Sequence, residues 1–510
     1  MPDQTLSVRL DVLVKAIRSK PRMSAGFLLG ITLFGLLLRI YRLDQVSFWL
    51  DEGTSAWMAE GAPVSQWLRD VHPPLYYALL SGWRTWSDSD WWLRFLSVLF
   101  GTATIPVVYS LGKHMFDDST GRWSAALLSV LHIHVTYSRE ARMYSLMVLL
   151  FACALWGLVV SAREGRAVGW IAYTVSASLL AYAHGLGGAY VLILAVLFPA
   201  VTASSRNIWR RWFLGNSVVA LLFCPYVLIY AQRVRGVAGH FWVRLESPEP
   251  PIFTTLFYST VFPIPPLSKI LAHQLDVHLS PLFGQWIWFA PIVLVLAFAV
   301  ARVPAENRWA TASLLLAYTL PIVLLSAISL VVRPLLIPRV LLPTVVPMVL
   351  VLGSFAVSTS IRPPWRQIGL ATVFIVLLVG DFYSFRYGAK EQWREASRYL
   401  QEHVQPTDVV WINRRIGRFL IDRYDPKGAL RLVPKLATDE LKALCPQDEA
   451  PACLEKALRA YPRGQTVWLV EGHLFEGVRT SADMWVASHL EGQEKAHMIG
   501  VSVERTILTH

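Results

Sequence analysis

Apolar residues fall into runs of about 17 to 22 residues with few charges between them. A run of this length crosses about 30 Å of hydrocarbon as an α-helix. The runs lack the alternation of apolar and polar positions that the strands of a membrane barrel show. The pattern therefore predicts a polytopic α-helical membrane protein.

About eleven membrane-spanning helices are expected by this criterion. They lie near residues 24–43, 93–112, 123–137, 143–161, 168–183, 187–204, 213–231, 284–302, 309–331, 339–358 and 367–383. Composition agrees with this prediction, because 54% of the 510 residues are hydrophobic and only 16% are charged. Soluble domains carry roughly 25% charged residues.

Basic residues predict the orientation of the chain. They gather at the N-terminus and in the turns after the even-numbered spans: Arg9, Lys15, Arg18, Lys20, Arg22, Lys113, Arg122, Arg163, Arg166, Arg206, Arg210, Arg211, Arg302, Arg308, Arg362 and Arg366. Short loops rich in Lys and Arg stay cytoplasmic, so the N-terminus is expected inside and the C-terminal segment outside. This placement accounts for most of the net charge of +12, and the scatter of basic residues among apolar helices argues against nucleic-acid binding.

Two domains are expected. Residues 1–383 form the membrane domain, with long outer loops at 44–92 and 232–283, and residues 384–510 form a small extracytoplasmic α/β domain. In the second domain, residues 391–401 have helical spacing, while DVVWI (408–412) and TVWLV (466–470) resemble short strands. Cys445 and Cys453 bracket a short loop there, and their spacing leaves open whether they form a disulfide.

Two adjacent acids follow the first span. Asp51 and Glu52 would lie at the outer membrane surface, where charge is costly to keep beside lipid. A carboxylate there can accept the proton of an attacking hydroxyl, and a second acid can bind a metal or hold an acceptor. The alternative is an ordinary helix start, because Asp and Glu favour the first turn.

A His-Pro-Pro sequence follows in the same loop, at residues 72–74. The prolines fix an extended entry to an apolar segment that we expect to be helical and to lie on or re-enter the membrane. His72 suits substrate positioning or metal ligation, with a structural role as the alternative. Tyr76 is a candidate neighbour of substrate, or else part of the aromatic belt at the membrane interface.

Several cations run against the expected orientation, because they lie on the outer side. Arg139 and Arg142 precede a span that opens with Tyr144, and Arg333 and Arg339 precede a later one. Arginine pairs with phosphate through two parallel hydrogen bonds, and a helix start adds a favourable dipole. The alternative is that these side chains reach lipid headgroups.

The second large outer loop adds Arg233, Arg235, His240 and Arg244. Together with the arginines above, these residues predict an outward-facing anion site beside the acidic pair. No Walker loop, dinucleotide fingerprint or HExxH sequence is present, so nothing indicates ATP, NAD or a zinc peptidase. A sugar transferred on this side of the membrane would come from a lipid-linked donor.

These motifs resemble, in kind and in order, the GT-C superfamily of integral-membrane glycosyltransferases. The similarity is strongest to its protein O-mannosyltransferase and aminoarabinose transferase branch. The similar segments are FWLDEG, HPPLYYALL, YSREARMYSL, HFWVRLESPEPP, LIPRVLLPTVVP and WREASRYLQEHV. They extend over roughly residues 25–410, and their order and topology are more specific than any one of them.

The resemblance implies an inverting transfer from a polyprenyl-phosphate sugar to a lipid, glycan or protein acceptor. It implies that Asp51 is the base, with Glu52 as the fallback, and that Arg139, Arg142, Tyr144 and Arg339 lie near the carrier phosphate. His72 matches the histidine of the family's HPPL stretch, and we expect Tyr76, Arg333 and His240 to position substrate together with it. Some members use a divalent metal, but this sequence has no compact ligand set. We expect the protein in a bacterial inner membrane.

Two other functions remain as alternatives. A flippase or transporter of lipid-linked sugars would carry charges within its spans near the membrane midplane, whereas here they cluster in outer loops. A membrane scaffold that displays the tail domain would leave the paired acids and the outward arginines without a role.

Overall fold

The computed structural model describes residues 21–68, 70–201, 206–237, 307–331, 338–357, 363–387, 390–437, 460–472 and 490–508. The chain divides into two compact units. The helical unit comprises Met1–Tyr41, Trp67–Tyr76 and Phe95–Arg386, and the mixed unit comprises Arg42–Gln66, Tyr77–Arg94 and Tyr387–His510. The mixed unit thus joins much of the first outer loop to the tail, a grouping that the sequence did not predict. The functional assignment of the two expected domains stays a prediction.

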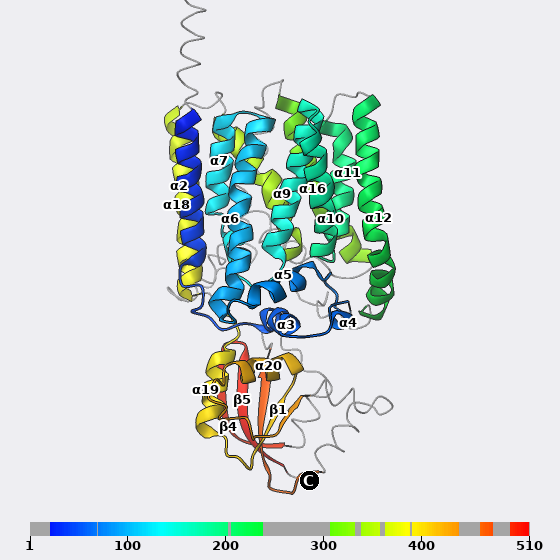
Figure 1. Cartoon of the computed structure of the whole chain (residues 1–510). Helices are drawn as coiled ribbons and strands as arrows, with labels where there is room; N and C mark the ends of the chain where they lie inside the picture. Colours follow the sequence, from blue (N-terminus) through cyan, green and yellow to red (C-terminus); the bar gives the residue numbers. More distant parts are fainter. Residues whose placement is uncertain are drawn as a thin grey trace, which may run out of the picture. The chain divides into compact units, whose positions relative to one another are not determined.

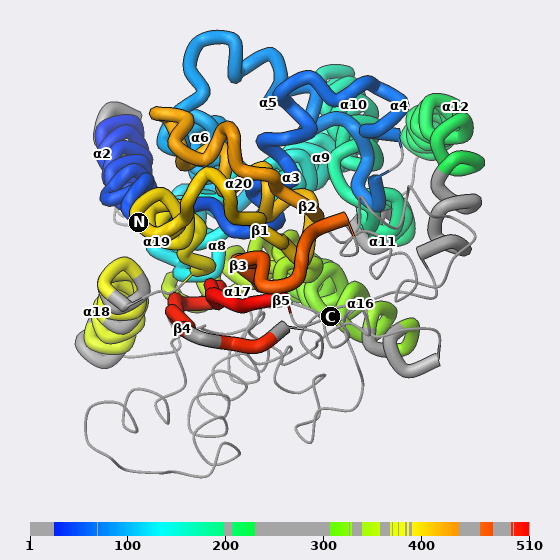
Figure 2. The backbone as a smooth tube through the Cα atoms, turned by 90° about the horizontal axis from the view of Figure 1, so that it is seen from below, coloured from blue at the N-terminus to red at the C-terminus, as the bar shows by residue number. Residues whose placement is uncertain are grey.

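The helical unit is a set of helices that run side by side (Figure 1). They are α2 (Pro21–Ile40), most of α6 (Asp90–Met115), α7 (Asp118–Ser129), α8 (His132–Ser138), α9 (Tyr144–Glu164), α10 (Ala167–Ala183), α11 (Gly187–Val201), α12 (Arg206–Val237), α16 (Arg308–Val331), the 3₁₀ helix η2 (Pro338–Thr344), α17 (Val345–Val357) and α18 (Pro363–Tyr387). Figure 2 shows α2, α11 and α12 nearly end-on, so the axes of these helices are nearly aligned.

Five stretches of these helices are long and apolar enough to cross a membrane: Asp90–Met115, Tyr144–Glu164, Asn207–Ile229, Arg308–Leu325 and Arg339–Val357. Shorter apolar stretches occupy Ala25–Ile40, Ala167–Ala183, Gly187–Leu197 and Ala371–Phe382. The polytopic helical class is therefore confirmed. The number of about eleven spans stays a prediction, because the span expected at 284–302 lies outside the described residues.

Local sequence signals set several helix ends. The carboxylate of Asp117 accepts a hydrogen bond of 2.7 Å from the backbone N–H of Thr120, so it caps the start of α7. Gly165 ends α9 with a φ of 66°, a left-handed conformation that glycine adopts without steric cost. The short turn after α9 lets α10 return antiparallel against it.

The third expected span, at 123–137, is wrong as a single helix. The structure has two shorter helices there, α7 and α8, with a break after Ser129. Carbonyls at a helix end lack partners within the helix and must be satisfied from elsewhere. The guanidinium of Arg39 supplies donors for two of these carbonyls. It donates to Ser129 O at 2.9 Å and to Leu128 O at 3.4 Å.

Arg39 belongs to a polar group inside the helical unit that the sequence did not reveal. Its side chain is fully buried and also contacts Nδ1 of His134 at 2.8 Å. Nearby, Nδ1 of His132 lies 2.7 Å from a carboxylate oxygen of Asp381 on α18. These contacts tie α2, the α7–α8 break and α18 together.

The mixed unit contains a five-stranded sheet and several short helices. The helices are α3 (Leu50–Ala59), α4 (Val64–Trp67), α5 (Leu75–Arg84), α19 (Trp393–His403) and α20 (Arg415–Arg423), with α4 and α5 crossing the division between the units. The strands are β1 (Val409–Ile412), β2 (Lys435–Ala437), β3 (Thr466–Gly472), β4 (Leu490–Met498) and β5 (Val501–Leu508). The expected strands at 408–412 and 466–470, the tail helix and the helix after the prolines are all confirmed.

The sheet has the strand order β2-β1-β3-β5-β4. Strand β1 pairs in parallel with β2 and β3, whereas β5 pairs antiparallel with β3 and β4. Trp393, Trp411 and Trp468 are buried in its core, and the α/β character of the tail is confirmed. Cys445 and Cys453 lie outside the described residues.

Candidate functional site

The two adjacent acids of the first outer loop have different surroundings, although both lie in the first turn of α3. Asp51 is partly exposed, while Glu52 is fully buried. Arg94 donates to both carboxylate oxygens of Glu52 at 2.7 Å, and Lys390 approaches one of them at 3.4 Å. Glu52 is thus held as one partner of a buried ion pair, and Asp51 is the acid with access to other molecules.

Arg94 also fixes the path of the loop that leads to α3. Its guanidinium donates to the carbonyls of Leu43, Val46 and Ser47 at 2.8 to 3.1 Å. Its charge lies 4.9 Å from the centre of the Phe48 ring. These contacts use the donors of one buried arginine to position the segment that carries Asp51.

Glu391 holds the same segment from the tail. Its carboxylate accepts from the backbone N–H of Leu50 at 2.9 Å and from the indole of Trp393 at 2.7 Å. Its backbone carbonyl accepts from the hydroxyl of Ser47 at 2.7 Å. The beginning of α3 is therefore fixed on two sides by residues that lie far from it in the sequence.

A second group, which we call the basic cluster, lies in the helical unit and comprises His72, Arg142, His184 and Arg339. His72 lies in the loop before α5, Arg142 just before α9, His184 at the end of α10 and Arg339 in η2. Three of the four were predicted from the sequence. His184 was missed, since nothing in AYAHGLG distinguishes it from a structural histidine.

Aromatic contacts pack the basic cluster. The rings of His72 and His184 have centroids 4.9 Å apart, and Tyr144 lies 5.9 Å from His184. The guanidinium of Arg142 lies 5.8 Å from the centre of the Tyr144 ring, which suits a cation–π contact. Tyr144 therefore contacts the cluster, as its place in the motif suggested.

Both histidines are held neutral, and both lie outside the candidate membrane-spanning helices. Burial, together with the charges of Arg142 and Arg339, lowers the pKa of His184 to about 3. Burial likewise keeps the pKa of His72 well below its usual value, with Arg142, His184 and Arg339 acting in the same direction. Nδ1 of His184 accepts from the backbone N–H of Leu186 at 3.0 Å, so its proton is on Nε2.

The backbone around the basic cluster is anchored by hydroxyl groups. Ser97 donates to the carbonyl of Arg142 at 3.0 Å, and the hydroxyl of Tyr76 lies 2.9 Å from that of Ser97. Tyr190 donates to the carbonyl of Val340, next to Arg339, at 2.7 Å. Tyr76 is fully buried, so these contacts favour an anchoring role for it over a place beside substrate.

Arg139 has contacts of a different kind from those of Arg142. Its guanidinium donates to the carbonyls of Leu38, Arg39 and Tyr41 at 2.6 to 3.3 Å, at the end of α2. It also lies 4.3 Å from the centre of the Phe385 ring. Such carbonyls are the ones that a helix end leaves without partners, and the contacts favour a capping role for Arg139.

The remaining expected site residues cannot be placed. Arg333 and His240 lie outside the described residues, as does most of the loop at 232–283. Within the described part of the chain, no group of three or more His, Cys, Asp or Glu side chains is suited to hold a metal ion. The basic cluster itself does not fit a cation, because two guanidiniums act on its imidazoles.

The chemistry of the basic cluster is that of an anion site. Two guanidiniums offer paired donors that match phosphate, and an imidazole N–H adds a neutral donor. Neutral histidines leave the arginines as the only charges among its four members. Such an arrangement can accept an anion without requiring that its imidazoles first take up protons.

Comparisons with known proteins agree with this fold. A model of the dolichyl-phosphate-mannose-protein mannosyltransferase family matches residues 71–230, a stretch that includes His72, Arg142 and His184. No curated protein matches the chain.

Solved structures match over nearly the whole chain. ArnT from Cupriavidus metallidurans in the apo state is 12% identical with a TM-score of 0.58, covering 95% of this chain and 98% of that one. The same protein bound to undecaprenyl phosphate gives a TM-score of 0.56 at 12% identity, over 94% and 98% of the two chains. AglB, an oligosaccharyltransferase from Archaeoglobus fulgidus in complex with an inhibitory peptide and a dolichol-phosphate, is 12% identical with a TM-score of 0.55, over 95% and 74%.

Proposed function

The chain has the fold of the GT-C superfamily of integral-membrane glycosyltransferases, and we propose that it transfers a sugar from a polyprenyl-phosphate carrier to an acceptor hydroxyl. The observation that carries the proposal is the basic cluster, which gathers two guanidiniums and two neutral imidazoles from four separate segments of the chain. The matched structures of ArnT and AglB hold undecaprenyl phosphate and a dolichol-phosphate, respectively. Both ligands are phosphates on polyprenyl chains, so the same headgroup is a sensible ligand for this cluster.

In the proposed complex, the carrier phosphate lies against Arg142 and Arg339, and the Nε2–H of His184 donates to one of its oxygens. A phosphodiester carries a single negative charge before transfer, whereas the departing phosphomonoester carries a larger one. Fixed positive groups therefore stabilise the transition state more than the bound donor. Because His184 is neutral with its proton on Nε2, it can donate to the phosphate without first taking up a proton.

The proposed reaction is a single displacement with inversion at the anomeric carbon. The acceptor oxygen forms a bond to that carbon while the bond from carbon to the carrier phosphate oxygen breaks and its electron pair stays with the phosphate. The hydroxyl proton passes to the carboxylate of Asp51, the partly exposed acid of α3. Every reacting group in these steps is supplied by the donor, the acceptor or the chain.

Glu52 is assigned a supporting role. Its carboxylate is committed to Arg94, so a proton placed on it would leave the buried guanidinium without its charge partner. This favours Asp51 over Glu52 as the base. No step is assigned to a metal ion, because the described residues offer no ligand set for one.

The finer assignments belong to the same proposal. The donor is a lipid-linked sugar, the acceptor is a lipid, a glycan or a protein, and the reaction takes place on the extracytoplasmic face of a bacterial inner membrane. Asp51, the basic cluster and the tail domain are all assigned to that face, with the N-terminus in the cytoplasm. The choice of face and the orientation of the N-terminus rest on the distribution of basic residues in the sequence.

A transfer assay in nanodiscs tests the proposal. Purified protein receives radiolabelled polyprenyl-phosphate sugars together with membrane extract, and label is followed into lipid, glycan and protein fractions. We expect transfer by the unaltered protein and its loss in Asp51→Asn. The unaltered protein could instead bind the donor, transfer no sugar and move the donor across the bilayer. That result would contradict the enzyme and support the flippase hypothesis.

A further inference from the structure

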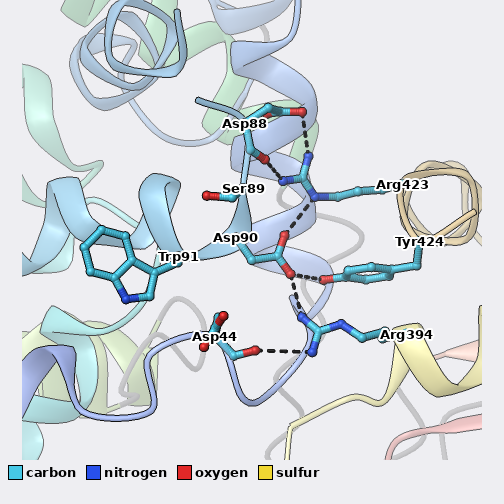
Figure 3. A pocket seen from close by; sticks show the side chains of 8 residues that line it. All are labelled: Asp44, Asp88, Ser89, Asp90, Trp91, Arg394, Arg423 and Tyr424. Atoms are coloured by element: carbon cyan, nitrogen blue, oxygen red, sulfur yellow. Dashed lines mark hydrogen bonds and ion pairs between the residues drawn. The ribbon is translucent and has the colours of Figure 1, made fainter. Parts of the chain in front are cut away.

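An open pocket of about 300 Å³ lies in the mixed unit (Figure 3). The residues that line it come from four segments: the loop before α3, the start of α6, the helix α19 and the end of α20. They are Asp44, Asp88, Ser89, Asp90, Trp91, Arg394, Arg423 and Tyr424. All of them belong to one compact unit, so the pocket is a feature of that unit alone.

One wall of the pocket is a connected set of ion pairs centred on Asp90. One of its carboxylate oxygens accepts from Nε of Arg423 at 3.0 Å, and the other accepts from Arg394 at 3.0 Å and from the hydroxyl of Tyr424 at 2.6 Å. Arg423 also donates to a carboxylate oxygen of Asp88 at 3.1 Å. The side chains of Asp90 and Arg423 are each 9% exposed, so this wall is fixed in place.

The other lining groups differ in character. Asp44 is exposed, and its backbone carbonyl accepts from Arg394 at 3.2 Å. Figure 3 shows Trp91 on the opposite side of Asp90 from Arg423 and Tyr424. The residues that line the pocket thus carry carboxylate, guanidinium, hydroxyl and indole groups.

This combination suits a neutral sugar. Carboxylates accept hydrogen bonds from sugar hydroxyls, guanidiniums donate to ring and hydroxyl oxygens, and an indole packs on the C–H faces of a sugar ring. A phosphate ligand would require an excess of positive charge, but three carboxylates oppose two guanidiniums here. Ligand pockets are typically of this kind, with a few fixed polar groups that set orientation.

We propose that this pocket binds a saccharide unit of the acceptor, so that the acceptor is a glycan or a glycolipid. The inference rests on the proposed function, because it assigns the acceptor side of the same transfer. A contact within the unit connects the pocket to the base: the hydroxyl of Tyr424 accepts from the backbone N–H of Phe48 at 2.8 Å, three residues before Asp51. The wall that would orient the saccharide therefore also positions the segment that carries the base.

The test measures saccharide binding without any transfer. The full chain is placed in phosphatidylcholine nanodiscs, free of glycoside detergents and glycerol, since both would compete as polyols. Methyl α-glucoside and N-acetylglucosamine are the probes, and binding is followed by saturation-transfer NMR in the absence of a donor. Inorganic phosphate and n-butylamine serve as anion and cation competitors.

Two pairs of variants locate the binding. Trp91→Ala removes the indole and Asp44→Asn alters an exposed carboxylate, and either is expected to weaken saccharide binding by about fivefold. Trp86→Ala is the matched control, because Trp86 is 82% exposed and does not line the pocket. Glu402→Gln is the control for Asp44→Asn, since Glu402 is an exposed acid of α19.

Each outcome decides the proposal. Binding that both pocket variants weaken and both controls leave unchanged supports a saccharide site. No binding, binding unchanged in Trp91→Ala and Asp44→Asn, or displacement by phosphate or butylamine alone would overturn it. Because the assay contains no donor, a transfer that proceeds normally alongside absent saccharide binding would refute this pocket and leave the proposed function standing. Saccharide binding by a protein that transfers no sugar would do the reverse.

Discussion

The buried pair of Glu52 and Arg94 and the basic cluster both place arginine in protein interior, but they treat its charge in opposite ways. In the mixed unit, one guanidinium meets both oxygens of one carboxylate at 2.7 Å. In the helical unit, burial and then the charges of Arg142 and Arg339 lower the pKa of two imidazoles, which stay neutral. The first arrangement matches opposite charges, and the second gathers like charges around neutral donors.

The difference separates structural from functional electrostatics. Two opposite charges that are buried as a pair hold the surrounding chain in one geometry. Removing one of them leaves the other buried without a partner, which lowers the stability of the protein. Like charges gathered at a site raise the free energy of the unliganded protein, and an anion relieves that cost when it binds. We therefore expect changes in the first region to alter stability and changes in the second to alter ligand binding.

The largest effect on activity is expected at Asp51, the residue next to the buried pair. Asp51→Asn removes the proposed base without touching the buried pair, so kcat should fall by about 10²- to 10⁴-fold. Thermal unfolding should change little, because the side chain is partly exposed. The measurement is transfer of labelled sugar, with unfolding followed in parallel. A variant with normal transfer would remove Asp51 from the mechanism.

The adjacent residue should show the opposite behaviour. Glu52→Ala leaves Arg94 buried without its carboxylate, and the protein should lose about 3 to 5 kcal/mol of stability. Denaturant titration of the protein in detergent measures the loss. Glu60→Ala is the control, because Glu60 forms an exposed pair with Arg84 and should cost far less. Glu52→Ala that unfolds normally but transfers no sugar would mark Glu52 as catalytic.

A smaller effect is expected from pH on folding stability, and it tests the electrostatics of the basic cluster. The pKa of His184 is about 3 in the folded chain and near 6.5 when unfolded. The unfolded state therefore binds the extra proton below pH 6.5, and stability falls as pH falls. Between pH 6.5 and 5 the loss from this residue approaches about 2 kcal/mol.

His184→Gln should reduce that loss, and His403→Gln should not, because His403 is exposed on α19. Undecaprenyl phosphate should also reduce it, since a bound anion offsets the charges of Arg142 and Arg339. The melting temperature between pH 7 and pH 5, with and without the ligand, measures both effects. If His184→Gln leaves the fall of the melting temperature between pH 7 and pH 5 unchanged, another titratable group controls the loss of stability in acid.

Local patterns made much of the architecture predictable. The apolar runs predicted the polytopic helical class, and DVVWI and TVWLV predicted two strands of the tail sheet. The break after Ser129 was not predictable, because it depends on Arg39, which supplies donors from 90 positions away in the sequence. A hydropathy pattern carries no information about such a distant partner.

The candidate site was predictable to the extent that its residues stood out from their surroundings. Arg142 and Arg339 did so, because cations on the outer side run against the expected orientation. His184 did not, and neither did Arg94, whose contact with Glu52 spans 42 positions. Arg139 and Arg142 looked equivalent in the sequence, and only the contacts of their guanidiniums separate a helix cap from a member of the cluster.

That pair of arginines gives the most direct test of the central claim, that the basic cluster binds the carrier phosphate. Binding of radiolabelled undecaprenyl phosphate is measured for the unaltered protein, Arg142→Ala and Arg139→Ala, each in nanodiscs and each shown to be folded. The account predicts that Arg142→Ala weakens binding by about 10- to 100-fold, the value of a charged hydrogen bond, while Arg139→Ala binds nearly normally. Equal loss in both variants, or normal binding by Arg142→Ala, would contradict it.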